Sequence, residues 1–196
     1  MTDIIMVFDV ESVGLYGDGY AVGLTVINRD DKTILDKDYF ACPSQKAEGN
    51  PEDRTWIETN VDPYLPSPNL ETPAQVRSEF WRVFQGWKNS PDLKRYSDAF
   101  FLFADCGYPV ETNFMAACVR DNEPEYKWNA PYPLHEVATI RAILGLDATL
   151  SYDLPKDKRH NPVEECLYIA PILVDWLNMV EDMRSIYAEA SRKAPQ

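Results

Sequence analysis

Apolar runs separated by polar turns occupy the first part of the chain and predict a β-meander. Ile4–Glu11 is apolar and rich in β-branched residues until it ends in acidic ones, which favours a buried central strand. The glycine-rich segment 14–19 separates it from a second apolar run, Tyr20–Ile27, and a polar turn precedes a third, Thr33–Cys42. Three successive strands joined by tight turns make an antiparallel sheet.

From Pro51 onward the apolar positions recur at helical spacing. A short helix begins at Pro51, and a second begins at Pro73 with Thr72 as its cap. Further helical segments are predicted over Val110–Arg120, over Leu134–Leu146 and from Asn161 to about Ala190, the last with a bend at Pro171.

A second buried strand, Ala99–Ala104, lies between these helices and is followed directly by Asp105. The resulting order, three strands, two helices, a strand, a helix, a short strand and two helices, predicts an α/β fold in which helices cover a mixed sheet. We expect one domain over residues 1–196. Sites in such sheets form outside the carboxyl ends of central strands, where the acidic residues of this chain collect.

Charge and composition narrow the choice of partners. The 19 basic and 32 acidic residues leave a net charge of −13, which excludes a basic coat for nucleic acid. Phosphate binding would need locally placed basic residues or bound cations. The four cysteines lie far apart and are expected to be free thiols. No apolar run is long enough to cross a bilayer, so we expect a cytoplasmic protein without a membrane partner.

Acidic residues follow both buried strands. Asp9 and Glu11 are two positions apart and project from one face, where they repel each other unless a hard cation such as Mg²⁺ or Mn²⁺ lies between them. Asp105 and Glu111 follow the second strand, and either could reach an ion held by Asp9. The simpler alternatives are a solvated strand end, a turn cap at Asp105 and a helix-dipole role for Glu111.

A third group precedes the last helix. Asn161, Pro162 and Glu164 fit the first positions of that helix, with Asn161 and Glu164 forming a cap. Glu165 is left without a structural role, and His160 precedes the cap, from where it could swing over a site lined by Glu165. Alternatively, His160 is a solvated surface residue.

Taken together, the three groups resemble a known family. Asp9–Leu15 resembles the D-x-E-[ST]-x-G-L opening of the DEDDh 3′–5′ exonucleases, and His160–Glu165 resembles their closing H-x4-D with Glu in the Asp position. Ala104–Met115 falls where the middle motif belongs, with Glu111 where the family has Asp. The segment Thr55–Pro66 resembles a small subgroup of bacterial and phage 3′–5′ exoribonuclease-like proteins.

The resemblance implies a ribonuclease-H-like fold and a metal-dependent 3′–5′ exonuclease, an exoribonuclease in the first instance. Its substrates would be the 3′ ends of single-stranded RNA or DNA, and a homodimer is expected because relatives are often dimers. Two Mg²⁺ or Mn²⁺ ions would be held by the carboxylates of Asp9, Glu11, Glu111 and Glu165, with His160 as general base. Leu15 would pack against the terminal base, and the backbone near Ser12 would meet the terminal ribose. Independently of the resemblance, Trp56 is a candidate for contact with bases because it is aromatic and lies outside the helical core stripes.

Two other functions remain open on the sequence. The two Asp-to-Glu changes fit a catalytically weak or inactive relative that binds nucleic-acid ends or a protein. The net charge of −13 fits an acidic protein that mimics nucleic acid. The sequence does not distinguish RNA from DNA as the substrate.

Overall fold

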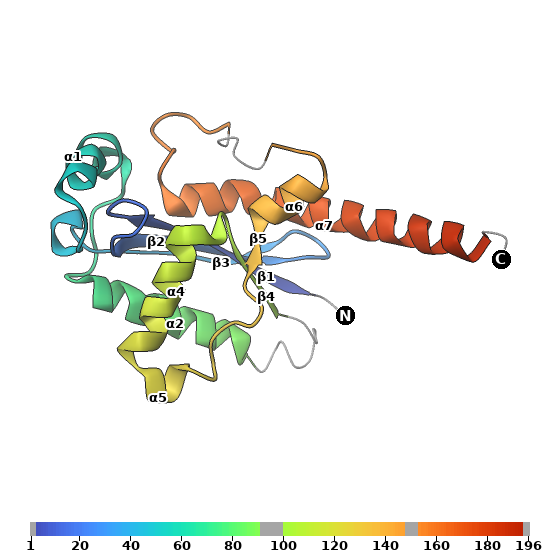
Figure 1. Ribbon diagram of the computed structural model, residues 1–196, viewed down its shortest axis with the longest axis horizontal. Helices are drawn as coiled ribbons and strands as arrows, with labels where there is room; N and C mark the ends of the chain where they lie inside the picture. The colour runs from blue at the N-terminus through green and yellow to red at the C-terminus, as the bar shows by residue number, and fades with distance from the viewer. Residues whose placement is uncertain (1–2, 91–99, 148–152, 194–196) are drawn as a thin grey trace.

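A five-stranded mixed sheet organises the computed structural model, which describes residues 3–90, 100–147 and 153–193 (Figure 1). Its strand order is β3-β2-β1-β4-β5. The antiparallel meander consists of β1 (Ile4–Ser12), β2 (Gly19–Asn28) and β3 (Ile34–Ala41). β4 (Phe100–Ala104) runs parallel to β1, and β5 (His135–Glu136) runs parallel to β4. The predicted fold class, an α/β fold in which helices cover a mixed sheet, is confirmed.

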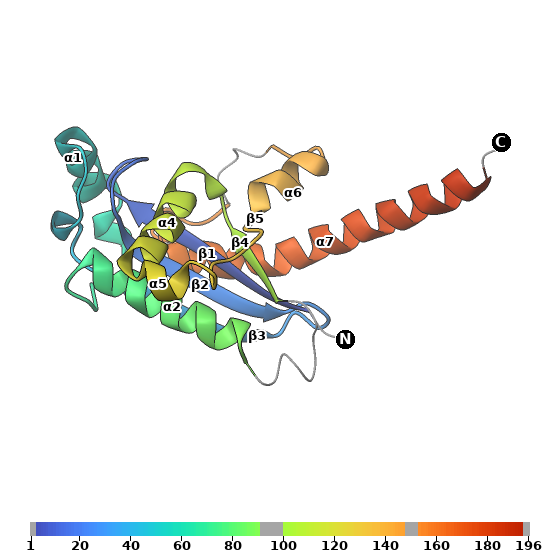
Figure 2. The ribbon, with the colours of Figure 1, turned by 60° about the horizontal axis from the view of Figure 1, so that its bottom comes forward.

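Helices cover both faces of this sheet, as Figures 1 and 2 show. The long helix α7 (Pro162–Lys193) packs on one face, and α2 (Pro73–Lys88) with α4 (Thr112–Asp121) lies on the other. Shorter helical elements connect these layers: η1 (Ser44–Lys46), α1 (Pro51–Asn60), η2 (Asp62–Tyr64), the π-helical turn η3 (Gly107–Glu111), α5 (Glu123–Tyr126) and α6 (Val137–Ile143).

Alternation along β1 divides the interior into two cores. Met6 and Phe8 belong to the larger core under α2 and α4, where the Phe8 ring lies 5.0 Å from that of Phe80. Ile5 and Val7 belong to the smaller core under α7. Because successive strand residues point to opposite faces, Asp9 and Glu11 share the α7 face with Ile5 and Val7.

Most predicted elements are present, with shifted ends where tertiary pairing competes with helical pattern. α2 begins with the expected Thr72 cap, in a capping box with Gln75. The helix predicted over Leu134–Leu146 starts only at Val137, because His135 and Glu136 pair with β4. α7 continues through Pro171 as one helix.

The amino end of α7 lies unusually close to the sheet. Gly23 on β2 is paired with Asp9, and a Cβ atom added to Gly23 would lie 2.2 Å from the backbone nitrogen of Val163. The Cys166 thiol donates to the Gly23 carbonyl at 3.5 Å. Any side chain at position 23 would push the start of α7 off the sheet, so this glycine sets where the helix begins relative to Asp9.

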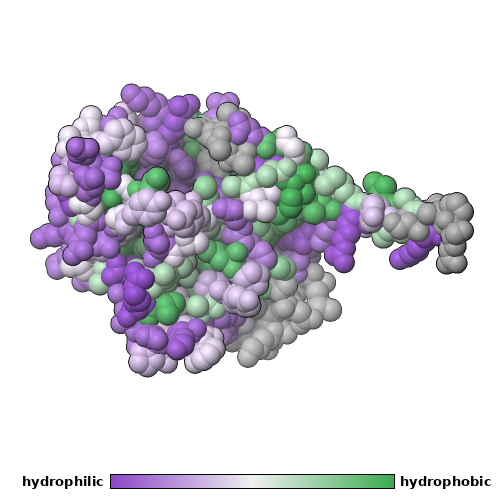
Figure 3. All heavy atoms as spheres, in the orientation of Figure 1, coloured by the Kyte–Doolittle hydropathy of each residue, from purple (hydrophilic) through white to green (hydrophobic). Residues whose placement is uncertain are grey.

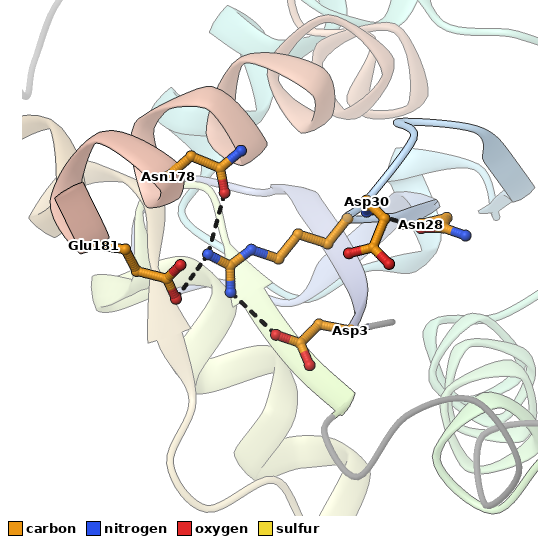
Figure 4. A network of polar contacts seen from close by, with 6 residues as sticks. Asp3, Asn28, Asp30, Asn178 and Glu181 are labelled. Atoms are coloured by element: carbon orange, nitrogen blue, oxygen red, sulfur yellow. Dashed lines mark hydrogen bonds and ion pairs between the residues drawn. The ribbon is translucent and has the colours of Figure 1, made fainter. Parts of the chain in front are cut away.

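The second half of α7 extends beyond the sheet, and Arg29 braces its base (Figures 2 and 4). The guanidinium of Arg29 binds Asp3 at 3.0 Å, Asn178 at 3.2 Å and Glu181 at 2.9 Å. Apolar residues are visible along this helix in the space-filling view of Figure 3. Among the described residues, no helix has both the length and the apolar character needed to cross a bilayer.

Replacing Gly23 by alanine should destabilise the fold by about 1–3 kcal/mol, because the methyl group overpacks a backbone contact. Urea unfolding followed by circular dichroism measures this. Gly86→Ala is the matched control: Gly86 lies in α2 with nothing within 4 Å of an added Cβ, so it should gain stability. Equal effects at both positions would contradict the proposed role of Gly23.

Candidate metal and catalytic site

The carboxyl end of β1 supplies the first two acids. Asp9 is buried, with 8% of its surface exposed, and the side chain of Glu11 is 13% exposed. Their spacing on the strand places both beneath the amino end of α7. A shift in pairing between β1 and β2 occurs at Glu11 and Ser12, just where the strand leaves the sheet.

β4 and the following turn supply the next two acids. The Asp105 N–H donates to the Phe8 carbonyl at 3.2 Å, so Asp105 continues the parallel ladder beside Asp9. Glu111 ends the turn η3 and is 4% exposed, and its charge helps to raise the pKa of Asp9. A proton or a cation would relieve this repulsion between two buried carboxylates.

The start of α7 supplies the last acid and the histidine. Asn161 accepts from the Glu164 N–H at 3.4 Å, as expected for the cap, but the Glu164 side chain binds Lys158 at 2.8 Å instead of completing the box. Glu165 does have a structural role, contrary to the expectation: it accepts a hydrogen bond from the backbone N–H of His160 at 2.8 Å. This bond joins the histidine loop to the carboxylate that faces the sheet.

Among the residues that the structure describes, the group suited to a cation consists of Asp9, Asp105 and Glu165, whose carboxylate oxygens lie within 4.8 Å of one another. Glu111 is outside this group, but its charge acts on Asp9. Glu11 instead faces His160, with 3.6 Å between its Oε1 and the histidine Nδ1. The structure therefore brings the predicted Asp9 and Glu165 together, and it adds Asp105, which the sequence offered as the alternative to Glu111.

Burial and mutual repulsion raise the pKa of every acid in this group. Desolvation is the largest cause of the raised pKa of Asp9, followed by the charges of Glu165 and Glu111. Burial likewise raises the pKa of Glu111 to about 8, and it raises the pKa of Asp105 and Glu165 above the usual carboxyl range. These side chains lose protons readily only where a positive charge replaces the water they have lost.

His160 lies at the rim of the carboxylate group. Its backbone is in the left-handed region with φ 59°, and its ring meets Trp56 edge-on at 5.9 Å between centroids. A side-chain hydrogen bond with Glu11 raises the pKa of His160, opposed by partial burial. Because Nδ1 faces the Glu11 carboxylate at 3.6 Å, a proton on Nδ1 is favoured, and Nε2 is then the basic nitrogen.

The predicted substrate residues differ in exposure. Leu15 is 61% exposed and Trp56 is 52% exposed, while Ser12 is buried and donates its hydroxyl to the Gly14 carbonyl at 2.7 Å. At Gly14, φ is 72° and an added Cβ would lie 2.2 Å from the Asp53 carboxylate. The β1–β2 turn and the start of α1 are therefore packed against each other.

Several neighbours of the site are not evident from sequence patterns. Glu136 accepts from the Gly107 N–H at 2.8 Å and also binds the Thr139 hydroxyl. The charge of Glu136 raises the pKa of Asp105, and the charge of Arg141 lowers it. A hydrogen bond with Tyr108 raises the pKa of Tyr16. In the sequence, Glu136 is distinguished only by its position next to the short strand expected before the last two helices.

Comparison with known proteins finds similarity in the fold alone. No family model matches the chain, and no curated protein sequence matches it. Solved structures of DEDDh-type 3′-exonucleases resemble it. The nuclease domain of 3′hExo, a DEDDh family member with bound rAMP, is 15% identical, with coverage of 90% of this chain and 92% of that one and a TM-score of 0.45.

Two further structures are similar to the same extent. A full-length 3′-exonuclease is 13% identical, with coverage of 90% and 82% and a TM-score of 0.49. Cell-death related nuclease 4 is 12% identical, with coverage of 90% and 64% and a TM-score of 0.48. Likeness at this level concerns the path of the chain and assigns no role to any residue here.

Neutralising one buried acid should stabilise the metal-free protein. We expect Glu111→Gln in EDTA to raise the free energy of unfolding by about 1–3 kcal/mol at pH 8, the typical cost of an uncompensated buried polar group. Because the pKa of Glu111 is raised to about 8, the gain should shrink as pH falls towards 4, where the wild-type side chain is protonated in both states. Glu71→Gln, at an exposed position, is the control for thermal unfolding across this pH range.

Calorimetric titration with Mn²⁺ should separate the two candidates for the middle ligand. If Asp105 is a direct ligand, Asp105→Asn weakens Mn²⁺ binding more than Glu111→Gln does, because Asp105 lies within the close oxygen group. The reverse order would restore Glu111 as the ligand. Unchanged affinity in Asp9→Asn would count against a cation at this position altogether.

Proposed function

We propose that this protein is a divalent-metal-dependent 3′–5′ exonuclease, with single-stranded RNA as the first candidate substrate. The observation that carries the proposal is the convergence of Asp9, Asp105 and Glu165, from three distant segments, into one partly buried oxygen group with His160 at its rim. The fold neighbours are consistent with a nuclease, but the proposal depends on the side chains of this chain.

The donor set suits Mg²⁺ or Mn²⁺. The available ligands are carboxylate oxygens, which hard cations prefer, and their raised pKa values reflect a repulsion that a cation would remove. We propose that Asp9, Asp105 and Glu165 hold metal directly, with Glu111 reaching it through or beside Asp9, and that Glu11 completes a second position. When bound, two such ions would stabilise negative charge on the phosphate and on the leaving oxygen.

The proposed reaction is hydrolysis of the terminal phosphodiester. Water forms a bond to phosphorus, the bond from phosphorus to the 3′ oxygen breaks, and a nucleoside 5′-monophosphate leaves while the shortened chain keeps a 3′ hydroxyl. His160 would accept the water proton at Nε2, and Glu11 would stabilise the resulting imidazolium through Nδ1. The bond from the His160 N–H to Glu165 keeps the base next to the carboxylates.

The substrate side of the proposal uses two exposed apolar side chains. Trp56 would stack on a nucleobase of any sequence, and Leu15 would pack against the terminal base. The backbone at Ser12 would meet the terminal ribose, because its hydroxyl is already held by Gly14. The carboxylates themselves repel phosphate, so binding of the strand should depend strongly on the metal.

One observation favours a second candidate, a protein that binds nucleic-acid ends without cutting them. Glu11 is turned to His160, and the close oxygen group contains three residues instead of four. If this arrangement persists with metal present, only one cation would be well held. Such a protein would keep the fold and bind ends, but it would turn over weakly or not at all.

A degradation assay on 5′-labelled single-stranded RNA with Mn²⁺ tests the enzyme. Laddering from the 3′ end is expected, and His160→Ala should slow it by about 10² or more while Mn²⁺ affinity is retained, given typical general-base contributions. His135→Gln, which removes the other imidazole, stacked on Phe103, is the matched control and should retain activity. Bound but intact RNA would favour the end-binding protein, and an unchanged rate in His160→Ala would remove His160 from the mechanism.

A further inference from the structure

A cavity of about 260 Å³ lies between the end of β3 and the segment that follows α1. Its lining combines aromatic rings and prolines with one carboxylate from η2: Tyr20, Tyr39, Pro43, Pro66, Pro68 and Asp62. Small-molecule sites are concave and mostly apolar with a few placed polar groups, and a volume of roughly 300–1,000 Å³ suits a drug-sized ligand. The size of this cavity therefore suits a single flat heterocycle.

The walls of this cavity are held in place by bonds within the protein. On one side, the Arg54 guanidinium of α1 donates to the carbonyls of Ser44 and Ala47, at 2.7 and 2.6 Å. On the other side, the Asn69 amide donates to the Tyr39 carbonyl at 2.8 Å. The cavity is therefore preformed, and a ligand would not have to order its walls on binding.

The Asp62 carboxylate in this cavity is oriented by two buried hydroxyl groups. The Tyr20 hydroxyl donates to Oδ1 at 3.0 Å, and the Ser44 hydroxyl donates to Oδ2 at 2.6 Å. Burial, followed by the charges of Asp62 and Glu11, raises the pKa of Tyr20, so this donor keeps its proton. A carboxylate offers about four acceptor positions, and these bonds use one on each oxygen. Asp62 is therefore a fixed acceptor with capacity for two further donors.

The register of the sheet places this cavity close to the candidate site. Glu11 on β1 is paired with Ala21 on β2, which is paired with Ala41 on β3, and Ala41 lines the cavity. At the usual spacing of strands, Ala41 lies about 10 Å from Glu11. Stacked nucleotides rise about 3.4 Å each, so this distance corresponds to about three nucleotides. A strand with its 3′ end at the carboxylates would reach the cavity with a base upstream of the terminal one.

The chemistry of the walls favours a nucleobase over a phosphate group. The carboxylate repels phosphate, whereas the ring of Tyr39 and the flat faces of the prolines pack well against an aromatic ring. Single-stranded RNA is commonly recognised by stacking together with hydrogen bonds to the Watson–Crick edges of its bases. Among the four bases, guanine presents two adjacent N–H donors on this edge, which match the two oxygens of a carboxylate.

A basic side chain lies beside η2, the element that carries Asp62. The Lys156 ammonium lies 5.9 Å from the centre of the Tyr64 ring, and Lys156 is exposed. In a chain with a net charge of −13, a strand needs local cations where it leaves the metal. Lys156 is placed to supply one for a nucleotide whose base occupies the cavity.

We propose that this cavity is a guanine subsite, in which Asp62 accepts from N1–H and N2–H of a base upstream of the 3′-terminal one and Lys156 contacts the phosphate of that nucleotide. The subsite rests on the proposed function, because the end of the strand at the carboxylates brings the base to the cavity. It adds a sequence preference that the carboxylates themselves do not supply.

Fluorescence anisotropy with 5′-labelled strands tests the subsite. Short oligouridine strands carry a single guanosine at each position in turn and are bound in Ca²⁺, an oxygen-seeking ion, with gels that report any cutting. Guanosine at one position upstream of the 3′ end should raise the affinity about tenfold over the all-uridine strand, the effect of one bidentate base contact. Adenosine or cytidine at that position should have a smaller effect, and an equal effect would overturn the assignment to guanine.

Two variants of the cavity should each abolish the preference. In Asp62→Asn the amide turns a donor towards guanine, while its oxygen can still accept from Tyr20. Ser67→Trp blocks the cavity from an exposed position in its lining and leaves Asp62 unaltered. Glu52→Gln is the matched control, because it removes one negative charge at an exposed position of α1 outside the cavity, and it should keep the preference. Circular dichroism should show a native melting transition for all three.

Lys156→Gln should weaken the binding of every strand alike and lower the slope of affinity against salt by about one, as the loss of a phosphate contact does. Strands that bind, and are cut in Mn²⁺, without any dependence on guanosine would overturn the subsite and leave the nuclease. A preference that survives Asp62→Asn and Ser67→Trp would likewise overturn the subsite. A guanine preference without cutting would overturn the nuclease and keep the subsite, and the absence of binding would overturn both.

Discussion

Repulsion among buried carboxylates is the constraint around which this molecule is built. Asp9 has almost no access to water and lies beside three other acids, so each carries a raised pKa. A chain folds in this way only if other contacts outweigh the cost of bringing them together. Here the two cores on opposite faces of β1 supply that stability, and the carboxylates collect at the one end of the sheet where the strands stop.

The strands that deliver Asp9 and Asp105 could be read from the sequence because each is a short apolar run followed directly by an acid. Glu165 was also found, since helix-start residues identify its position. The sequence alone does not decide between Asp105 and Glu111 as the middle ligand, because both follow β4. Only the path of the turn η3 determines that Asp105 joins the oxygens of Asp9 and Glu165 and that Glu111 stays outside this group. That path depends on tertiary contacts such as the bond from Gly107 to Glu136, made across 29 residues.

The local sequence pattern also does not predict the role of Gly23, which leaves room for a close backbone contact. Gly23 lies in the middle of a buried strand and gives no periodic signal, yet it allows Pro162 and Val163 to lie directly on the sheet. The bond from the His160 N–H to Glu165 is not predicted either, because residue type alone does not indicate the positive φ of His160 or the position of its backbone. Both features arise from the fit between α7 and β2.

The turn after β1 and the first helix form a single unit. The Asp53 carboxylate fills the space beside Gly14, and the Asp18 N–H donates to the Glu48 carbonyl at 2.7 Å while the Asp18 carboxylate accepts from the Glu48 N–H at 3.1 Å. Leu15 and Trp56 consequently belong to this packed unit, whereas His160 comes from the segment ahead of α7. The edge-on contact between the Trp56 and His160 rings therefore joins the unit of the first helix to the start of the last one.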